Sequence, residues 1–362
     1  MTRRPPAADT DHTLFATMDQ LIADAGGDLS QLRGKLTREI MHTAIKLLRD
    51  DAGEGEVKLV SRSLKELRYA LKVFRPFDAT RKISIFGSAR TPEDHPTYQA
   101  CVDFSRDMAE SGWMVITGAG DGIMRAGMGG AGTEKSFGVS IRLPFETNAN
   151  EYIVGDPKLI TFRYFFTRKL MFMWMSHAIA LFAGGFGTQD EGFEALTLIQ
   201  TGKAPVVPIL LIDAPATGSR PDPGSGHDYW KKWDTYVRES LLEGGYISPE
   251  DLNLYFVTDD PAAAAEHVRH FYRNYHSQRF VRDELVLRLH RPLTRAQLGD
   301  LNDRFAKLLV TEGRITQQDG PLEEEHGELP QLHRLRFAST KAGYGHLRAM
   351  IDRINDLDAG IE

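Results

Sequence analysis

Hydrophobic positions in the first fifth of the chain recur every three or four residues. Three segments show this spacing, residues 14–26, 32–51 and 61–77, and it is typical of amphipathic helices. Gly26, Gly27 and residues 53–56 separate the segments, and Pro76 closes the last one. The pattern predicts a helical N-terminal extension over residues 1–80. Its first twelve residues, rich in Pro, Arg and Asp, are expected to form a disordered tail.

From Lys82 the pattern changes to short apolar runs that are rich in β-branched residues. These runs cover residues 83–87, 113–118, 137–143, 178–184, 206–213 and 254–259, with segments of helical period between them. The alternation predicts a doubly wound, Rossmann-like parallel sheet over residues 81–277. Several runs end in Gly, at the carboxyl edge where such sheets bind ligands. A surface loop is expected at residues 214–228, and helices at 229–245 and 261–277.

The last part of the chain, residues 278–362, has a third pattern. It reads as strand, helix, strand, strand and helix over residues 284–290, 294–310, 314–318, 333–339 and 343–357. This order predicts a small α+β module of ferredoxin-like type. The acidic run Glu323–Glu325 is interpreted as a solvated loop. The predicted fold class is therefore α/β, a doubly wound Rossmann-like sheet with an N-terminal helical extension and a small C-terminal α+β module.

Composition indicates which partners and which cellular compartment to expect. A net charge of −6 and a pI of about 6.1 provide no basic field for nucleic acid, so none is expected to bind. The single cysteine, Cys101, cannot form an internal disulfide and is interpreted as a buried thiol in a reducing cytoplasm. The most apolar helical stretch is interrupted by Arg168 and Lys169 and is too short to span a bilayer. Without a signal peptide or membrane span, the sequence predicts a soluble cytoplasmic protein.

The sequence does not match the common nucleotide-binding motifs. Residues 118–123, GAGDGI, would need Gly at position 123 for a dinucleotide fingerprint, but Ile123 stands there. Arg142 follows where an acidic ribose ligand would be expected, and Lys203 lacks the Walker spacing. No His, Cys and Asp cluster indicates a metal. The prediction is therefore no redox cofactor and no metal.

The stretch LFAGGFGTQDEGFEAL, residues 181–196, combines a glycine loop with acidic side chains. Gly184, Gly185 and Gly187 follow an apolar run and precede a helix that is expected to begin near Thr188. The N–H groups of a first helical turn, together with the helix dipole, form an anion site. Glu191 has two interpretations, because Thr188-x-x-Glu191 is also the spacing of a capping box. The stretch by itself leaves both the structural and the functional interpretation open.

Residues 161–177 predict a helix that is apolar nearly all round, which is typical of burial. Arg168 and Lys169 are unusual on such a helix, because buried cations need partners. Either the pair reaches to a domain surface, or it faces an anionic ligand at the edge of the sheet.

Residues from about 82 to 277 resemble the LOG family, long labelled "lysine decarboxylase". Residues 183–191, AGGFGTQDE, match the family's P-G-G-x-G-T-x-x-E, and residues 118–124, GAGDGIM, match G-G-G-x-G-I-M. Residues 141–146, IRLPFE, contain the family's Leu-Pro strand end, and residues 162–172 its Arg-Lys helix. Ala183 replaces the hallmark proline, Ala119 replaces a glycine, and Arg125 stands where relatives often carry Glu.

The resemblance implies a function. LOG proteins resemble cytokinin riboside 5′-monophosphate phosphoribohydrolases and bacterial nucleotide 5′-monophosphate nucleosidases, which act on substrates such as AMP. Glu191 would hold the ribose and activate water, and Arg168 would bind phosphate or ribose and orient that carboxylate. A carboxylate near the sugar stabilises the oxocarbenium-like transition state. The implied substrate-binding residues are Ser88, Gly118, Gly120, Gly122, Met124, Lys169, Gly184, Gly185, Gly187, Thr188 and Glu194.

Several alternatives stay open at this point. The chain could be a non-catalytic nucleotide sensor, or a pterin-cofactor carrier of the same superfamily. Lysine decarboxylation is disfavoured, because Lys169 and Lys203 form no recognisable pyridoxal-phosphate site. His177 is interpreted as a packed residue, and Arg90 as either a site or a surface residue. Family precedent and the apolar helix favour a homo-oligomer, a dimer or higher. The C-terminal module is either a separate regulatory or assembly module, or a fused packing element that completes the core.

Overall fold

The computed structural model describes residues 7–142, 149–215 and 227–358. The chain divides into two compact units, Met1–Glu66 and Leu67–Glu362. The predicted Leu-Pro strand end and most of the predicted loop at 214–228 lie outside the described residues. Helices α1 (Ala7–Asp24) and α2 (Leu32–Arg49) belong to the first unit, and α3 (Glu54–Phe74) runs from it into the second.

Two of the N-terminal helices, α1 and α3, begin earlier than the sequence predicted. Residues 7–12, expected in a disordered tail, are the first residues of α1. The predicted break at residues 53–56 lies slightly earlier, over residues 50–53, since α2 ends at Arg49 and α3 begins at Glu54. Glu54 and Glu56 lie in its first turn, where acidic side chains interact favourably with the helix dipole. The Glu56 carboxylate also accepts a hydrogen bond from the Gly53 N–H at 2.7 Å.

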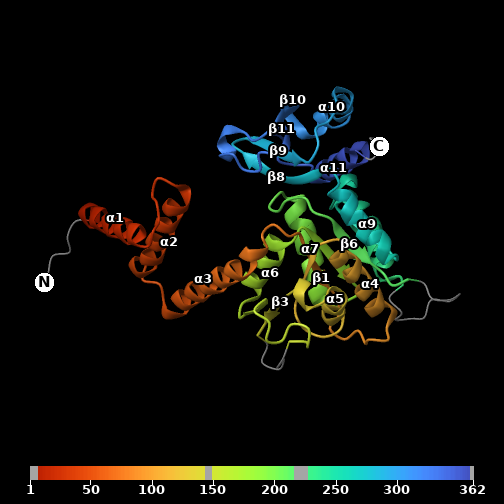
Figure 1. The fold of residues 1–362 in the computed structure, drawn as a ribbon, viewed down its shortest axis with the longest axis horizontal. Helices are drawn as coiled ribbons and strands as arrows, with labels where there is room; N and C mark the ends of the chain where they lie inside the picture. The colour runs from red at the N-terminus through yellow and green to blue at the C-terminus, as the bar shows by residue number, and fades with distance from the viewer. Residues whose placement is uncertain (1–6, 143–148, 216–226, 359–362) are drawn as a thin grey trace. The chain divides into compact units, whose positions relative to one another are not determined.

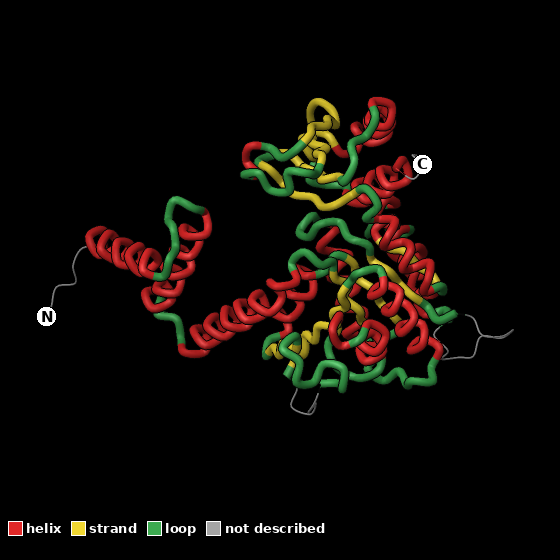
Figure 2. Tube along the Cα trace, viewed as in Figure 1, coloured by secondary structure: helices red, strands yellow, loops and turns green. Residues whose placement is uncertain are grey.

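The second unit contains a seven-stranded sheet in which every neighbouring pair is parallel. Figures 1 and 2 show strands of this sheet among the helices of the unit. Its strands are β1 (Lys82–Phe86), β2 (Met114–Thr117), β3 (Ser136–Ile141), β4 (Leu159–Phe162), β5 (Ala178–Phe182), β6 (Ile209–Ile212) and β7 (Tyr255–Thr258). The six predicted strands are all present, and β4 was missed. The order is β4-β3-β2-β1-β5-β6-β7, so the chain changes direction across the sheet between β1 and β5. Open α/β sheets bind ligands at such a switch point.

Helices cover both faces of this sheet, as predicted for a doubly wound fold. Helices α4 (Pro96–Glu110), α5 (Ile123–Ala131) and α9 (Pro261–Phe271) contribute buried side chains to one core, together with Ile83 and Ile85 of β1. Helices α6 (Phe165–Met175), α7 (Phe186–Gln200) and α8 (Tyr229–Tyr236) contribute to the other, together with Phe86. The alternation along β1 follows from the two-residue period of a strand.

Helix α6 differs from its prediction in extent and in burial. Residues 161 and 162 of the predicted helix belong to β4, and the helix itself begins at Phe165. Met171 and Phe172 are buried, but Phe166 is 54% exposed and Trp174 is 73% exposed. The expectation of burial on all sides was therefore wrong, and α6 leaves an apolar face uncovered in the single chain.

A second sheet of four antiparallel strands lies in the C-terminal part. Its elements are β8 (Tyr275–Val281), β9 (Glu284–Leu289), α10 (Arg295–Leu309), β10 (Val310–Asp319), β11 (His333–Ser339) and α11 (Tyr344–Asp358). The order β10-β11-β9-β8 places β11 between β9 and β10, as in a split β-α-β unit, and the remaining edge strand comes first in the chain. The helix predicted over 261–277 ends at Phe271, because residues 275–277 belong to β8. The three-domain division at residues 80 and 277 stays a prediction.

The two sheets share one hydrophobic core. The cluster that contains Phe86 and Leu181 of the parallel sheet continues through Leu285 and Leu287 of β9 to Ile354 of α11. The remaining helical elements are short: η1 (Arg75–Phe77), η2 (Thr133–Lys135), the π-helical η3 (Val237–Leu242), η4 (Pro249–Leu254) and η5 (Glu323–Glu325).

The acidic run in η5 is not simply a solvated loop. Glu325 is 3% exposed and forms ion pairs with Arg288 at 2.6 Å and Arg334 at 3.0 Å, both from neighbouring strands. Burial by itself would raise the pKa of Glu325, but hydrogen bonds from Arg334, the Leu322 N–H and Arg288 lower it to about 2. The prediction of solvation was wrong for this residue, because its partners are distant in the sequence.

Cys101 is packed inside the fold, and His177 is half-buried. Cys101 is fully buried, and burial raises the pKa of its thiol. The His177 Nδ1 accepts the Lys82 N–H at 3.2 Å, and burial lowers the pKa of its imidazole to about 3. Among the helices that the structure describes, none has the length and apolar character to cross a membrane.

Candidate active site

A cavity of about 600 Å³ lies at the carboxyl ends of β1 and β5, at the switch point of the parallel sheet. Four chain segments line it: the loop after β1, the start of the loop after β2 with α5, the first turn of α6, and the start of α7. The lining residues are Phe86, Gly87, Ser88, Ala89, Arg90, Gly118, Met124, Phe165, Arg168, Gly185, Phe186, Gly187, Thr188, Asp190 and Glu191. Three of the LOG-like motifs thus meet at one place.

Helix α7 begins two residues earlier than the sequence predicted. Gly185 is its N-cap, Phe186 is its first residue, and the Thr188 N–H donates to the Gly185 carbonyl at 3.1 Å. Thr188 therefore lies inside the first turn, and the proposed capping box with Glu191 was wrong. A Thr-x-x-Glu spacing forms a capping box only when the threonine itself occupies the N-cap. The structural interpretation of Glu191 loses its basis.

Glu191 is a buried carboxyl group on the wall of the cavity. It is 6% exposed, and within the described residues its Oε2 atom has no hydrogen-bond partner. Burial raises the pKa of Glu191 to about 7, against the opposing effect of the Lys169 ammonium group. A buried polar atom without a partner is costly in a folded chain, and a carboxyl group with this pKa exchanges its proton near neutrality.

Arg168 and Lys169 are adjacent in the sequence but reach different surroundings. The Arg168 Nε donates to the Val139 carbonyl of β3 at 2.9 Å, and its guanidinium lines the cavity. Lys169 lies outside the cavity lining and forms ion pairs with Asp190 and Glu194, each at 2.7 Å. Lys169 and Glu194, both predicted to bind substrate, therefore contact each other beside the cavity.

The predicted glycines fall into two groups. Gly118, Gly185 and Gly187 line the cavity, whereas Gly120, Gly122 and Gly184 do not. Gly122 has a φ of +60° at the N-cap of α5, where side chains are strained. A Cβ on Gly184 would collide with the side chain of Thr188.

Gly185 and Gly187 have no such internal reason to be glycine. A Cβ at either position would meet no atom within 4 Å, and neither residue has a positive φ. Glycine at Gly187 also weakens the first turn of a helix relative to alanine. The open space in front of both residues faces the cavity, so a ligand could approach the backbone there.

Ser88 and Arg90, the predicted residues in the loop after β1, both line the cavity. The Ser88 N–H donates to the Ala183 carbonyl at 3.1 Å, and its hydroxyl accepts the Arg90 N–H at 3.1 Å. These bonds tie the loop after β1 to the end of β5. Arg125, by contrast, is not among the lining residues and forms ion pairs with Glu93 and Glu151.

Sequence reasoning missed three lining residues that could contact a ligand. Phe165 is 54% exposed, Phe186 is 96% exposed, and Asp190 presents a carboxylate next to Glu191. The sequence could have indicated Phe186 as a ligand contact, because an aromatic residue between two glycines of an anion loop has few neighbouring side chains to pack against. Phe165 looked like part of a buried helix.

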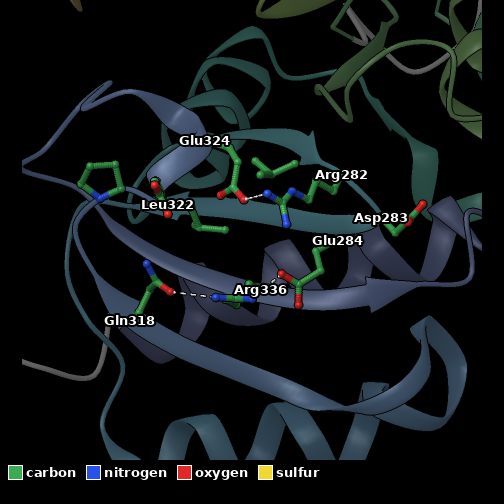
Figure 3. Close-up of a pocket in the computed structure, with 10 residues that line it drawn as sticks. Arg282, Asp283, Glu284, Gln318, Leu322, Glu324 and Arg336 are labelled. Atoms are coloured by element: carbon green, nitrogen blue, oxygen red, sulfur yellow. Dashed lines mark hydrogen bonds and ion pairs between the residues drawn. The ribbon is translucent and has the colours of Figure 1, made fainter.

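A second cavity, of about 510 Å³, lies on the C-terminal sheet (Figure 3). Its two arginines are already paired with neighbouring side chains. Arg282 contacts Glu324 at 2.7 Å, and Arg336 contacts Glu284 at 2.6 Å and Gln318 at 3.1 Å. An anion would have to displace these acceptors, so the cavity at the switch point is the better candidate. Across the described ranges, no group of three His, Cys, Asp or Glu side chains could hold a metal ion.

Comparison with known proteins agrees with the residue pattern. The family model described as "Possible lysine decarboxylase" matches residues 121–268, which include Arg168, the glycine loop and Glu191. This part of the chain, less than half of the sequence, is similar to that LOG-like family. The LOG-like segment also contains α6 and α7, the two helices that supply most of the cavity's functional groups.

Solved structures similar to this chain include two that are named for molybdenum cofactor. The molybdenum cofactor carrier protein of Chlamydomonas reinhardtii is 20% identical, with a TM-score of 0.34, over 52% of this chain and 96% of its own. The molybdenum cofactor binding protein of Rippkaea orientalis is 16% identical, with the same TM-score and coverage. DNA processing protein A of Helicobacter pylori is 14% identical, with a TM-score of 0.33, over 52% and 79%. No curated protein sequence matches the chain.

Proposed function

We propose that this LOG-like chain hydrolyses the N-glycosidic bond of nucleoside 5′-monophosphates, releasing the free base and ribose 5-phosphate. The observation that carries the proposal is the position of Glu191. Its buried carboxyl group, which has an Oε2 without a partner among the described residues, lies on the same cavity wall as Arg168 and the first turn of α7. This arrangement offers an anion site and a carboxylate to one small ligand.

The first turn of α7 would hold the 5′-phosphate. Gly185 and Gly187 leave the backbone open to the cavity, and the N-terminus of a helix favours anions. Arg168 adds a positive charge to the cavity wall beside Gly118, in the loop after β2. Binding energy from a phosphate that does not react can be used to orient the ribose.

Glu191 would act at the sugar. As the C1′–N bond breaks, its electron pair leaves with the base, and positive charge develops on the ribose ring. A nearby carboxylate stabilises that charge. Water adds its oxygen to C1′ and gives one proton to Glu191. The base takes a proton from solvent as it leaves, and Glu191 later returns its proton to solvent. A pKa of about 7 for Glu191 suits a group that takes up and returns a proton.

The base would lie near the two exposed aromatic rings. Phe165 and Phe186 come from different helices and line the same cavity. Aromatic side chains stack on any base, so they support a nucleotide ligand without choosing among bases. The cavity volume of about 600 Å³ is within the range of small-molecule sites.

The test is a panel of nucleoside monophosphates, with released base and ribose 5-phosphate measured together. Wild-type chain is expected to release both in equal amounts, and Glu191→Gln is expected to lose at least about a thousandfold in kcat. Glu134→Gln, at an exposed position away from the cavity, is the control. Tight binding of a nucleotide without release of base would favour the sensor or carrier alternative. Full turnover by Glu191→Gln would reject the catalytic role.

Self-association is a further part of the proposal. Phe166, Leu170 and Trp174 form an exposed apolar face on α6, next to the helix turn that supplies Arg168. Exposed apolar patches of this kind mark interaction surfaces. Sedimentation of the full chain should show a dimer or larger, and a monomer at micromolar concentration would contradict this.

A further inference from the structure

We propose that Tyr229 is a positioning residue that holds the glycine loop in the shape that binds phosphate. This inference rests on the proposed function, since it concerns the same anion site. Tyr229 is the first residue of α8 and does not line the cavity itself. Its effect on a ligand would therefore pass through the backbone of the loop.

Tyr229 bonds both ends of the loop. Its hydroxyl donates to the Gly184 carbonyl at 2.5 Å, and it accepts a hydrogen bond from the Gln189 amide at 2.6 Å. Gly184 precedes the helix, and Gln189 lies in its first turns. The intervening residues 185–188 all line the cavity. The Tyr229 side chain therefore holds Gly184 and Gln189, the residues on either side of the proposed anion site.

The bond to Gly184 has a directional consequence. In a trans peptide the C=O and N–H groups point in opposite directions. Tyr229 holds the Gly184 carbonyl toward α8, which fixes the direction of the Gly185 N–H on the other side of the same peptide plane. Gly185 lines the cavity and Gly184 does not. The geometry assigns Tyr229 the role of keeping a backbone donor directed toward the bound anion.

Asp213 holds the first turn of α8, in which Tyr229 lies. This aspartate directly follows β6 and is fully buried. Its carboxylate accepts the N–H groups of Trp230 at 2.9 Å and Lys231 at 3.2 Å, the two residues after Tyr229. The Tyr229 ring also packs edge-on against the buried ring of Trp230, with centroids 4.8 Å apart. A flexible surface tyrosine would not hold a loop in one shape, but this one is fixed at its backbone and its ring.

The test compares Tyr229→Phe with Tyr255→Phe. Both changes remove one hydroxyl that donates a hydrogen bond, but the Tyr255 hydroxyl donates to Asp234 at 2.6 Å and does not contact the loop. Calorimetry measures binding of ribose 5-phosphate to each full-length protein, and kinetics with AMP separates KM from kcat. Loss of one aligned donor should weaken ribose 5-phosphate binding about fivefold in Tyr229→Phe and raise KM similarly, with a smaller change in kcat. Tyr255→Phe should bind like wild type.

Each outcome decides the proposal. Wild-type affinity in Tyr229→Phe, or equal weakening in both variants, would overturn it, and so would a wild-type chain that does not bind ribose 5-phosphate at millimolar concentration. Binding by wild type without hydrolysis of any monophosphate rejects the proposed function alone, and the affinities still judge Tyr229. Gln189→Met leaves the hydroxyl in place but removes its donor partner. Should Tyr229→Phe not fold, this variant replaces it, with a smaller weakening expected and unchanged affinity again overturning the role.

Discussion

Arg168 and Gly118 lie so close together that a Cβ on Gly118 would stand 2.6 Å from the Arg168 Nη2 atom. The absence of a side chain at Gly118 therefore gives the guanidinium its place on the cavity wall. Met124 occupies the same space, since its Sδ would also lie 2.6 Å from that Cβ. This contact joins two LOG-like motifs that are about fifty residues apart in the sequence.

Gly118→Ala should displace Arg168 from the cavity. Both neighbours are ends of flexible side chains, so the fold can adapt, but the cation moves away from the phosphate. A misplacement of about 1 Å can cost about a hundredfold in rate, and kcat/KM should fall by roughly that factor with little change in melting temperature. Gly55→Ala, on an open position of α3, is the control. Unchanged kcat/KM would show that the reaction does not depend on the close contact between Gly118 and Arg168.

The pH dependence of turnover should follow Glu191. Because the carboxylate form is needed and burial raises the pKa of Glu191 to about 7, kcat should rise with pH up to about 7 and then level off. Stability has the opposite trend. A carboxyl group whose folded pKa lies above its unfolded value of 4.5 stabilises the fold below that value and loses this contribution as pH rises through 7. A pH–rate profile that is flat between pH 5 and about 8 would contradict the assignment.

Alanine at Gly187 should separate phosphate binding from folding. The substitution removes a helix-weakening glycine and should stabilise the fold by up to about 1 kcal/mol. Its methyl group would occupy the open space in front of the backbone, so the rate advantage of AMP over adenosine should shrink at least about tenfold. Gly299→Ala, an open position within α10, should stabilise similarly and leave the advantage intact. Retention of the full advantage in Gly187→Ala would remove the glycine loop from phosphate binding.

Glu325 and Glu191 are both buried, but they should respond differently to loss of charge. Glu325→Gln removes the negative charge between Arg288 and Arg334, and breaking such a buried pair costs about 3–5 kcal/mol of unfolding free energy. Glu324→Gln, next in the sequence and paired with the exposed Arg282, is the control and should change stability by less than about 1 kcal/mol. Chemical denaturation measures both. Equal stability of the two variants would show that the buried ion pairs of Glu325 contribute no more to the free energy of unfolding than the exposed pair of Glu324.

Ala119 should become more stable as glycine. Its φ is +65° although its side chain is buried, and the left-handed region costs an L-residue about 1–2 kcal/mol. The family motif has glycine at this position. Ala119→Gly should therefore raise the melting temperature, whereas Ala126→Gly, within α5 and also buried, should lower it. A lower melting temperature for both would mean that no strain is relieved at Ala119.

The sequence predicted the parallel sheet well, because buried parallel strands carry strong local signals. Strand β4 was missed since its four residues, LITF, run into the apolar start of α6 without a turn signal. The end of α9 was placed too late for a similar reason. No glycine or proline separates Phe271 from Tyr275, and the chain turns there because Asn355 of α11 accepts the N–H groups of Asn274 and Tyr275.

The residues of the candidate site carry local sequence signals where a motif lies within one short stretch. The glycine loop, Arg168 and Glu191 line one cavity at the switch point. Contacts between distant parts of the chain were not predictable in this way. The burial of Glu325 depends on Arg288 and Arg334, and the support of the loop depends on Tyr229, which is 45 residues from Gly184. Asp213 is the one member of this support that a local pattern could have indicated, because it is an acidic residue directly after an apolar strand.

The hydrophobic core that continues from Phe86 and Leu181 to Leu285 and Ile354 has a thermodynamic consequence. Elements that share one core do not lose their packing separately, so residues 67–358 should unfold in a single cooperative transition. A ligand that binds only the folded chain raises its stability according to its concentration relative to Kd. A nucleotide held at the parallel sheet would therefore protect β9 and α11 from proteases and slow their amide exchange, although it contacts neither.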